Sequence, residues 1–175
     1  NPYLDLLTMD IPGYLKKFLS EEHSLEDYAT VIDHFREKAE LIQGTALDEV
    51  RAGAYVVDCT ELKKILSDTA NEVADLLLDQ VRNTAHESNT RVCEAYTFMN
   101  TEVVKQPDTG DAVLQLKKYI QKSATEQEAL QAEIKANKAR EEFLGRYCFD
   151  VPEGDFALAM RSYEWPKKMI SIMKE

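Results

Sequence analysis

The sequence is poor in the residue patterns that build disulfide frameworks, zinc sites and membrane spans. Its three cysteines, Cys59, Cys93 and Cys148, are an odd number and lie far apart, whereas zinc sites and disulfide-rich domains use closely spaced pairs. We therefore expect buried or idle thiols in a reducing compartment. No stretch approaches the roughly 18 uninterrupted apolar residues of a membrane span, and no basic segment precedes an apolar run at the start of the chain. The protein is expected to be soluble, cytosolic or cytoskeletal, with no membrane partner.

The sequence also lacks the motifs that carry common enzyme chemistry. It contains neither a Gly-x-Gly-x-x-Gly stretch nor a Gly-rich loop followed by Lys-Ser or Lys-Thr, the familiar phosphate-binding motifs. His23, His34 and His86 are too scattered for a metal-binding pair. The acidic segments 108–111 and 150–155 lack the alternating oxygen ligands and the terminal Glu of a calcium loop. We expect no catalytic, cofactor-binding or metal-binding residue in this chain, and an enzyme subunit is the least favoured hypothesis.

Positive charge is in the minority. The 175 residues hold 21 Lys and Arg against 32 Asp and Glu, for a net charge of -11. A surface this acidic repels phosphate backbones, so nucleic acid is not expected as a partner. The length and the 44% hydrophobic content are ordinary for one folded domain or two very small ones.

Glycine and proline are scarce, with 6 Gly and 5 Pro. Between them, apolar residues recur at steps of three and four, the period of an amphipathic helix. The pattern predicts an all-α fold, an elongated antiparallel helical bundle. Residues 53–57, Gly-Ala-Tyr-Val-Val, are strand-like but too short for a sheet, so we expect one extended crossover near them. The alternative is pairing with a strand from elsewhere in a longer chain, and residues 45–51 could form a short helical turn.

Two capping-box patterns mark helix starts, Ser24 with Asp27 and Asp58 with Glu61. After the second, the inward stripe either ends near residues 86–89 or continues to residue 103 as one unusually long helix, and the pattern leaves both open. The expected inward residues of the first helix are Leu25, Tyr28, Ile32, Phe35, Ala39 and Ile42. Those of the second region are Leu62, Ile65, Leu66, Val73, Leu76, Leu77 and Val81, followed by Val92, Tyr96, Met99 and Val103.

A further helix is expected to follow the turn at residues 107–111, where carboxylates suit the positive end of a helix dipole. A heptad seam can be counted along it, but several of its positions are polar, so the seam is too weak for an independent coiled-coil dimer. This helix therefore needs neighbours within the bundle. The seam positions are Val113, Leu116, Ile120, Ser123, Gln127, Leu130, Ile134, Asn137, Glu141 and Leu144.

Aromatic residues concentrate between positions 143 and 165, and aromatic surface is what stabilises junctions and interfaces. We expect a packed elbow there. Pro166 lacks an amide donor and restricts Trp165, so it can stop the preceding element and redirect the chain, or form a plain turn. The expected structural junction comprises Tyr55, Val57, Asp58, Phe143, Tyr147, Phe149, Phe156, Tyr163, Trp165 and Pro166.

Three stretches share their order and spacing with one known family. The first is 52–59, Ala-Gly-Ala-Tyr-Val-Val-Asp-Cys, followed by Leu62-Lys63 and Leu66; the second is the helix start at 107–120. The third contains Phe143-Leu-Gly-x-Tyr, Asp155-Phe156 and Tyr163-Glu-Trp-Pro-Lys. Together they cover roughly residues 50–170. They resemble the stem of dynein heavy chains, particularly of the axonemal branch.

This resemblance implies a position at the end of the tail, just N-terminal to the linker that spans the motor ring. It implies a non-catalytic stem module that transmits force between the tail anchor and the ATP-driven, microtubule-based motor ring. The ring, with its ATP and Mg, and the microtubule-binding stalk would lie further toward the C-terminus, outside this chain. The implied partners are the rest of the heavy chain, dynein intermediate or light chains, a neighbouring heavy chain, and microtubules through the parent. The implied location is the cytoplasm, the cytoskeleton and the axoneme of the cilium.

The expected organisation has three parts. Residues 1–45 form an N-terminal helical segment whose packing the sequence leaves open, residues 46–145 form the helical bundle, and residues 146–175 form the aromatic-rich elbow that leads toward the linker. Because the chain starts at Asn1 without Met and its last residues carry no helix-ending signal, we interpret it as a piece of a longer protein. The alternative function is a helical adaptor or scaffold domain that binds a partner helix or a cytoskeletal filament.

Overall fold

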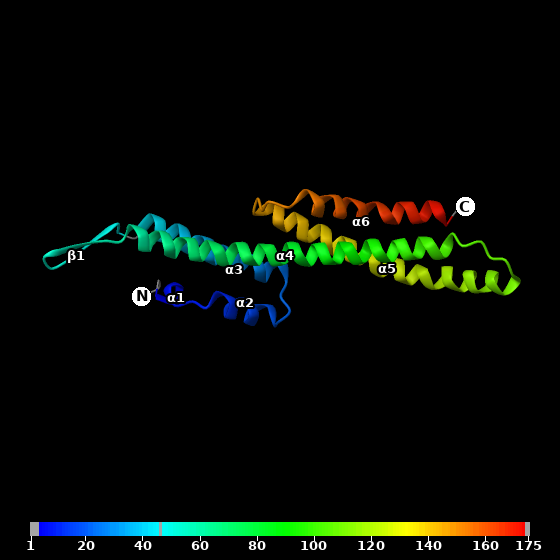
Figure 1. Cartoon of the computed structure of the whole chain (residues 1–175), viewed down its shortest axis with the longest axis horizontal. Helices are drawn as coiled ribbons and strands as arrows, with labels where there is room; N and C mark the ends of the chain where they lie inside the picture. Colours follow the sequence, from blue (N-terminus) through cyan, green and yellow to red (C-terminus); the bar gives the residue numbers. More distant parts are fainter. Residues whose placement is uncertain (1–3, 46, 174–175) are drawn as a thin grey trace. The chain divides into compact units, whose positions relative to one another are not determined.

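The computed structural model describes residues 4–45 and 47–173. Within them the chain forms six α-helices and one two-stranded antiparallel sheet (Figure 1), so the predicted all-α class is confirmed. The helices are α1 (Leu4–Leu7), α2 (Ile11–Leu19), α3 (Leu25–Thr45), α4 (Thr60–Val103), α5 (Gly110–Arg146) and α6 (Glu153–Ile172), and the strands are β1 (Glu49–Ala52) and β2 (Tyr55–Asp58). The chain divides into two compact units, Asn1–Gln80 and Val81–Glu175, here called unit 1 and unit 2.

In unit 1, α3 begins at the predicted capping box. The Asp27 amide donates to Ser24 Oγ at 3.2 Å, and the Ser24 amide donates to Asp27 Oδ2 at 2.8 Å. This reciprocal pair satisfies two of the amides that a helix start leaves without partners. Of the six residues of the predicted inward stripe of α3, Ile32, Phe35, Ala39 and Ile42 are buried, whereas Leu25 and Tyr28 are half-buried.

The core of unit 1 lies where α3 meets the first part of α4. The hydroxyl of buried Ser67 on α4 donates to the carbonyl of Ala39 on α3 at 3.5 Å. An ion pair also joins the two helices, with 3.6 Å between Arg36 Nη2 and Asp75 Oδ1. The buried apolar residues of α4 in this unit are Leu66, Ala70, Val73, Ala74, Leu77 and Leu78. The predicted inward positions Leu62, Ile65 and Leu76 are wrong, since their side chains are 43%, 51% and 38% exposed.

Residues 49–58 form a β-hairpin, which corrects the expected crossover. Residues 55–57 are extended, as predicted, but they pair with residues 50–52 immediately before them, and 49–52 are strand rather than helix. A two-residue turn makes this pairing possible. The first residue of the turn, Gly53, has φ +64, and the second, Ala54, does not have a positive φ. This combination is typical of a type II′ turn, whose twist matches that of the two strands in a hairpin.

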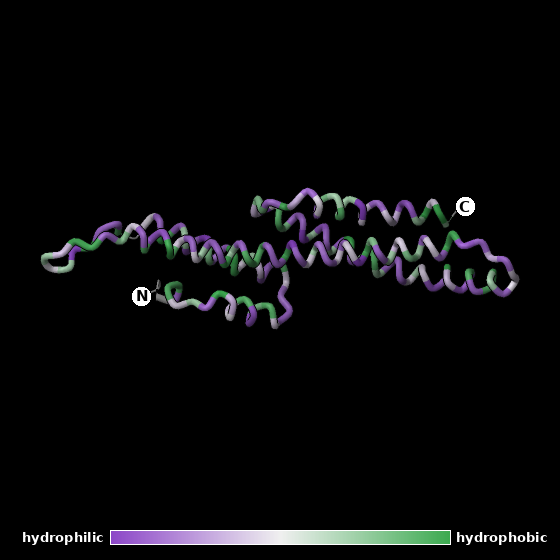
Figure 2. Tube along the Cα trace, in the orientation of Figure 1, coloured by the Kyte–Doolittle hydropathy of each residue, from purple (hydrophilic) through white to green (hydrophobic). Residues whose placement is uncertain are grey.

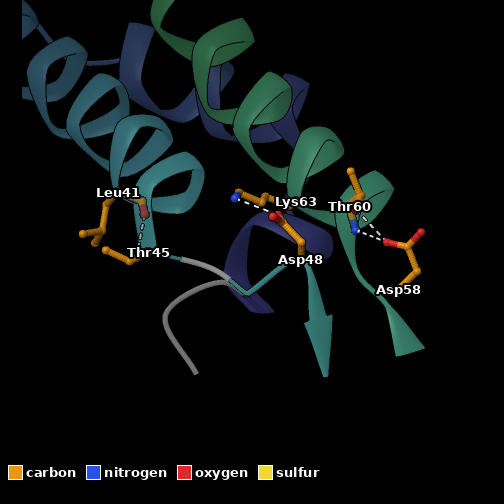
Figure 3. Close-up of polar contacts among 6 residues, drawn as sticks. All are labelled: Leu41, Thr45, Asp48, Asp58, Thr60 and Lys63. Atoms are coloured by element: carbon orange, nitrogen blue, oxygen red, sulfur yellow. Dashed lines mark hydrogen bonds and ion pairs between the residues drawn. The ribbon is translucent and has the colours of Figure 1, made fainter. Parts of the chain in front are cut away.

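Polar contacts tie the base of the hairpin to the start of α4 (Figure 3). Asp48 Oδ1 accepts from Lys63 Nζ at 3.0 Å, and the amide of Cys59 donates to the carbonyl of Asp48 at 2.6 Å. Asp58 Oδ1 accepts from both the amide of Thr60 at 2.9 Å and its hydroxyl at 2.6 Å. The predicted helix start at Asp58 is therefore correct, although its carboxylate binds Thr60 rather than the amide of Glu61.

Helix α4 resolves the alternative that the sequence left open. It runs without interruption for 44 residues, from Thr60 to Val103, through the polar stretch at residues 86–89. Hydrophobic and hydrophilic segments are interspersed along it (Figure 2). The buried positions of α4 continue into unit 2 as Val81, Ala85, Val92, Cys93, Tyr96 and Met99.

In unit 2, both ends of α5 are closed by specific contacts. At its start, Thr109 Oγ1 accepts from the amide of Ala112 at 3.3 Å. At its end, the amide of Phe149 donates to Leu144 O and that of Cys148 to Gly145 O, both at 3.1 Å. This is the Schellman arrangement, and Cys148 takes the left-handed position with φ 50 that Gly usually fills.

The apolar core of unit 2 is formed by α4, α5 and α6. Val92, Tyr96 and Met99 of α4, Leu130 and Ile134 of α5, and Met169 of α6 make one buried cluster, here called the apolar cluster. The seam predicted along α5 is only partly buried: Leu130, Ile134 and Leu144 are inside, but Val113 is 50% and Ile120 38% exposed. Among the described helices, none is long and apolar enough to cross a lipid bilayer.

Candidate functional site: the helix junction of unit 2

Three of the ten predicted junction residues lie in unit 1, on the hairpin. Tyr55 and Val57 are 78% and 48% exposed, and Asp58 caps the start of α4. Val50 pairs with Val57 and Ala52 with Tyr55. Because side chains alternate between the faces of a strand, these four share one apolar face of the hairpin.

Three more junction residues lie around the end of α5. Phe143 is buried and packs against Tyr147, with ring centroids 5.1 Å apart, while the Arg146 guanidinium lies over the Phe143 ring at 5.1 Å. Tyr147 is the C-cap residue of α5, and the Phe149 amide completes the Schellman motif. These aromatic side chains thus cover the turn that reverses the chain between α5 and α6.

The aromatic residues of α6 differ in their roles. Trp165 and Tyr163 are partly buried and pack against the apolar cluster, and Trp165 stacks on Tyr96 of α4 with a centroid distance of 5.9 Å and an interplanar angle of 6°. Phe156 is 58% exposed and lies outside this packing. The structure therefore assembles part of the predicted junction, and Tyr96, which the sequence marked only as an inward residue, is one of its central members.

Pro166 does not end or redirect the chain, so that interpretation is corrected. It lies inside α6, which continues for six residues to Ile172. A proline there cannot donate a hydrogen bond to the carbonyl of Ser162, four residues earlier. Burial of Ser162 and Met169 on either side of it, together with the packing of Trp165, keeps the helix intact, because tertiary packing can outweigh a single unfavourable residue.

Next to the apolar cluster lies a buried group of polar side chains, here called the polar layer: Ser88 and Asn89 of α4, Asn137 of α5 and Ser162 of α6. Asn137 Nδ2 donates to Ser88 Oγ and to Asn89 Oδ1, both at 2.9 Å. Ser162 Oγ lies 2.9 Å from Asn89 Oδ1 and 2.8 Å from the carbonyl oxygen of Ala159, and its single hydroxyl hydrogen is shared between these two acceptors. Every helix of the junction therefore contributes a side chain to one connected hydrogen-bond network.

Charged residues border the polar layer. Arg140 Nη1 donates to Asn137 Oδ1 at 2.7 Å, and Ser88 Oγ donates to Glu133 Oε1 at 2.9 Å. Glu133 also pairs with Arg91 of α4. The Tyr163 hydroxyl faces the Glu141 carboxylate without reaching hydrogen-bond geometry. Burial, reinforced by the nearby acidic groups, raises the pKa of Tyr163, so its hydroxyl stays protonated.

A second polar contact ties the start of α6 to α4. Asp155 Oδ2 accepts from Arg82 Nη1 at 2.8 Å, and its Oδ1 lies 2.8 Å from His86 Nδ1. Partial burial by itself would raise the pKa of the Asp155 carboxyl, but the hydrogen bonds and charges of Arg82 and His86 outweigh it and hold that pKa below its ordinary value. The carboxylate is thus ionised and bound at the first turn of α6, where a helix dipole also favours it.

The junction side chains pack against one another and form hydrogen bonds, and the buried cysteine of unit 2 is not reactive. Burial raises the pKa of the Cys93 thiol, so it lacks the thiolate character of a reactive cysteine. Cys59 is partly exposed and Cys148 exposed, and all three are free, so only Cys93 is buried as predicted. Within residues 4–45 and 47–173, no group of three His, Cys, Asp or Glu side chains could hold a metal ion. An open hollow of about 660 Å³ lies at the α4–α5 connection, between Glu102 and Tyr119.

Sequence reasoning missed the polar layer. The signal was present, because Asn137 occupies a seam position of α5 and Ser88-Asn89 interrupts the apolar stripe of α4. Considered on its own helix, the first weakens the seam and the second leaves the length of the helix open. Two polar interruptions on predicted antiparallel neighbours, each flanked by apolar residues on both sides, can instead be matched to each other, since a buried polar residue requires a buried partner.

Comparison with known proteins gives axonemal dynein heavy chains as relatives. No protein-family model matches the chain. It is 27% identical over 163 residues to dynein axonemal heavy chain 12 of Homo sapiens, covering 92% of this chain and 5% of that one. The identity to dynein axonemal heavy chain 12 of Rattus norvegicus is 23% over 167 residues, and to dynein axonemal heavy chain 3 of Homo sapiens 25% over 151 residues, which covers 86% of this chain.

The matched region is a small part of these relatives. The chain spans 5% of the length of both heavy chain 12 proteins and 4% of the length of human heavy chain 3. The similarity nevertheless extends across both units of this chain, since it covers 86% to 92% of the residues. Over most of its length, the chain is therefore similar to a short segment of axonemal dynein heavy chains.

Proposed function

We propose that the chain is a non-catalytic structural module in the stem of a dynein heavy chain. In this role it transmits force between the tail anchor and an ATP-driven, microtubule-based motor ring located elsewhere in the parent. The observation that carries the proposal is the 27% identity over 92% of the chain to a segment covering 5% of human dynein axonemal heavy chain 12. The order of the three sequence stretches, within roughly residues 50–170, supports a position just N-terminal to the linker.

The architecture suits a load-bearing element. Helices α4 and α5 are 44 and 37 residues long, and stretching such helices breaks backbone hydrogen bonds and exposes packed side chains, whereas a flexible linker would only uncoil. The junction adds aromatic stacking, the polar layer and the Arg82–Asp155 pair between helices. In the proposed role, the stiffness of the helices is the function.

The proposal carries further expectations about the parent protein. ATP and Mg would bind in its motor ring and not in this chain. Partners would be the rest of the heavy chain, dynein intermediate or light chains or a neighbouring heavy chain, and microtubules would be bound through the parent. The location would be the cytoplasm and cytoskeleton, in particular the axoneme of the cilium.

A compliance experiment on the full-length heavy chain tests the proposal. Ten Gly/Ser residues inserted into α4 between Gln80 and Val81 interrupt its hydrogen-bond ladder, and the matched control carries the same insertion between Gly53 and Ala54, in the turn of the hairpin. We expect the α4 insertion to leave microtubule-stimulated ATPase activity unchanged while lowering the stall force in an optical trap. The control should retain both.

Two results would contradict this function. Equal stall forces for the two insertions would mean that α4 does not carry the load. Measurable ATP hydrolysis by the isolated 175-residue chain would mean that the chain is itself catalytic. Circular dichroism of the isolated chain with each insertion shows whether the helices of both units remain folded, so that loss of force can be assigned to compliance.

A further inference from the structure

The junction of unit 2 contains polar residues where packing alone would place apolar ones. Asn137 and Ser162 are 0% exposed, Asn89 2% and Ser88 7%. On one side of the polar layer lies the apolar cluster, and on the other lie buried Phe143, Leu144 and Ala159. The polar layer therefore separates two apolar layers along the same three helices.

Apolar layers by themselves specify the axial position of helices weakly. Leucine, isoleucine, valine and methionine side chains can replace one another across a helix interface with small losses of stability. A shift of α5 by one heptad would still set apolar residues against apolar residues, for example Leu130 or Leu144 in the place of Asn137. Such a shift would keep much of the buried apolar surface.

The polar layer distinguishes the observed alignment from these alternatives. A shift of α5 would move Asn137 away from Ser88 and Asn89 and into apolar surroundings. Both Asn137 Nδ2 hydrogen bonds would be lost, and the Ser88–Glu133 hydrogen bond at the border would be lost with them. Buried polar groups without partners are strongly unfavourable, so only one alignment satisfies all members of the network.

We propose that the polar layer fixes the axial register of α4, α5 and α6. Ser88 and Asn89, Asn137, and Ser162 form a positioning network, and the apolar layers on either side supply most of the burial. A single buried Asn sets register in coiled coils in the same physical way, at a cost in stability. This inference concerns the chain itself and does not depend on the proposed function.

Distances between spin labels on the exposed faces of the helices test the register. The labels are placed in the 175-residue chain at Glu94 of α4 paired with Ala136 of α5, and at Glu94 paired with Ala157 of α6. The native cysteines are first replaced, as Cys59→Ser, Cys93→Ala and Cys148→Gly. With the polar layer intact, each pair should give one narrow distance distribution in a pulsed electron paramagnetic resonance measurement.

The variant combines Asn89→Leu, Asn137→Leu, Ser88→Ala and Ser162→Ala, which removes every member of the network at once. At the border, Arg140 loses its bond to Asn137, and Glu133 loses its bond from Ser88 but keeps its pairing with Arg91. We expect it to remain helical and to show an additional or broadened distance, displaced by about 5 Å for one helical turn or about 10 Å for one heptad. The matched control, Leu130→Ile with Ile134→Leu, changes apolar packing while conserving volume. It should keep the single narrow distance.

Each other outcome would overturn the inference. A folded variant with the parent distances would show that the apolar layers and loops set the register unaided. A variant without helical structure would show that the polar layer is required for folding itself, and not for the choice between alignments. A control that shifts as much as the variant would assign register to apolar packing.

Discussion

Trp165 is the aromatic residue through which the junction can be tested most directly. A fully buried Trp truncated to Ala costs about 3–5 kcal/mol, but Trp165 is only partly buried, so roughly half of that range applies. Loss of its stacking on Tyr96 adds about 0.5–1.5 kcal/mol to this cost. Removal of its buried Nε1, which has no hydrogen-bond partner among the described residues, lowers the cost by about 1 kcal/mol. We expect Trp165→Ala to lower the free energy of unfolding by about 2 kcal/mol.

The matched control is Phe156→Ala, an aromatic truncation on the same helix at a side chain that is 58% exposed. Its effect should stay within about 0.5 kcal/mol, as for most surface substitutions. Urea unfolding followed by circular dichroism measures both variants, since Trp165 is the only Trp and fluorescence would be lost with it. If the whole chain unfolds together, Trp165→Ala should lower Tm by roughly 4–8 °C. Equal losses in the two variants, or no loss in Trp165→Ala, would refute the packed junction.

Four smaller perturbations test other features. Tyr96→Phe should leave stability unchanged or raise it by about 1 kcal/mol, because the buried Tyr96 hydroxyl has no partner among the described residues; a loss in urea unfolding would contradict this. Cys148→Gly should raise Tm, since φ 50 costs a non-Gly residue about 1 kcal/mol, and an unchanged Tm would argue against strain. Pro166→Ala should add about 2–3 kcal/mol by restoring a helical hydrogen bond in α6; a destabilised variant would show that the proline is needed. The lowered pKa of Asp155 means that its ionised form stabilises the fold above the ordinary carboxyl pKa of 3.8 and that this stability is lost as the pH falls through the folded pKa; the stability difference between the parent and Asp155→Asn should therefore shrink below about pH 4, and a constant difference would exclude the linkage.

The sequence predicts the helices well because they depend on local signals. The capping box at Ser24, the helix start after the turn at residues 107–111 and the four buried residues of the α3 stripe all follow from neighbouring residues. The hairpin was missed because its pairing depends on Gly53, whose positive φ turns a short strand-like stretch back on itself. The low helix preference of proline also gives the wrong prediction at Pro166, where packing on the apolar cluster keeps helix α6 intact.

The junction was harder to predict because its contacts join residues far apart in the sequence. An aromatic count marks residues 143–165 but cannot separate exposed Phe156 from packed Trp165. The partner of Trp165 is Tyr96, and the partners of Asn137 are Ser88 and Asn89 on α4. Such pairs follow from the alignment of antiparallel helices, which a periodic pattern on a single helix does not provide.

The unbroken course of α4 sets a rule for changes of length in this protein. Each residue of an α-helix turns the chain by about 100° and advances it by 1.5 Å. Within unit 2, one residue inserted between the buried positions Ala85 and Val92 would therefore turn the later buried residues of α4 away from the earlier ones by more than a quarter of a turn. Insertions or deletions of 7 or 11 residues nearly restore the angular phase, so evolutionary changes of length in this helix should come in such steps.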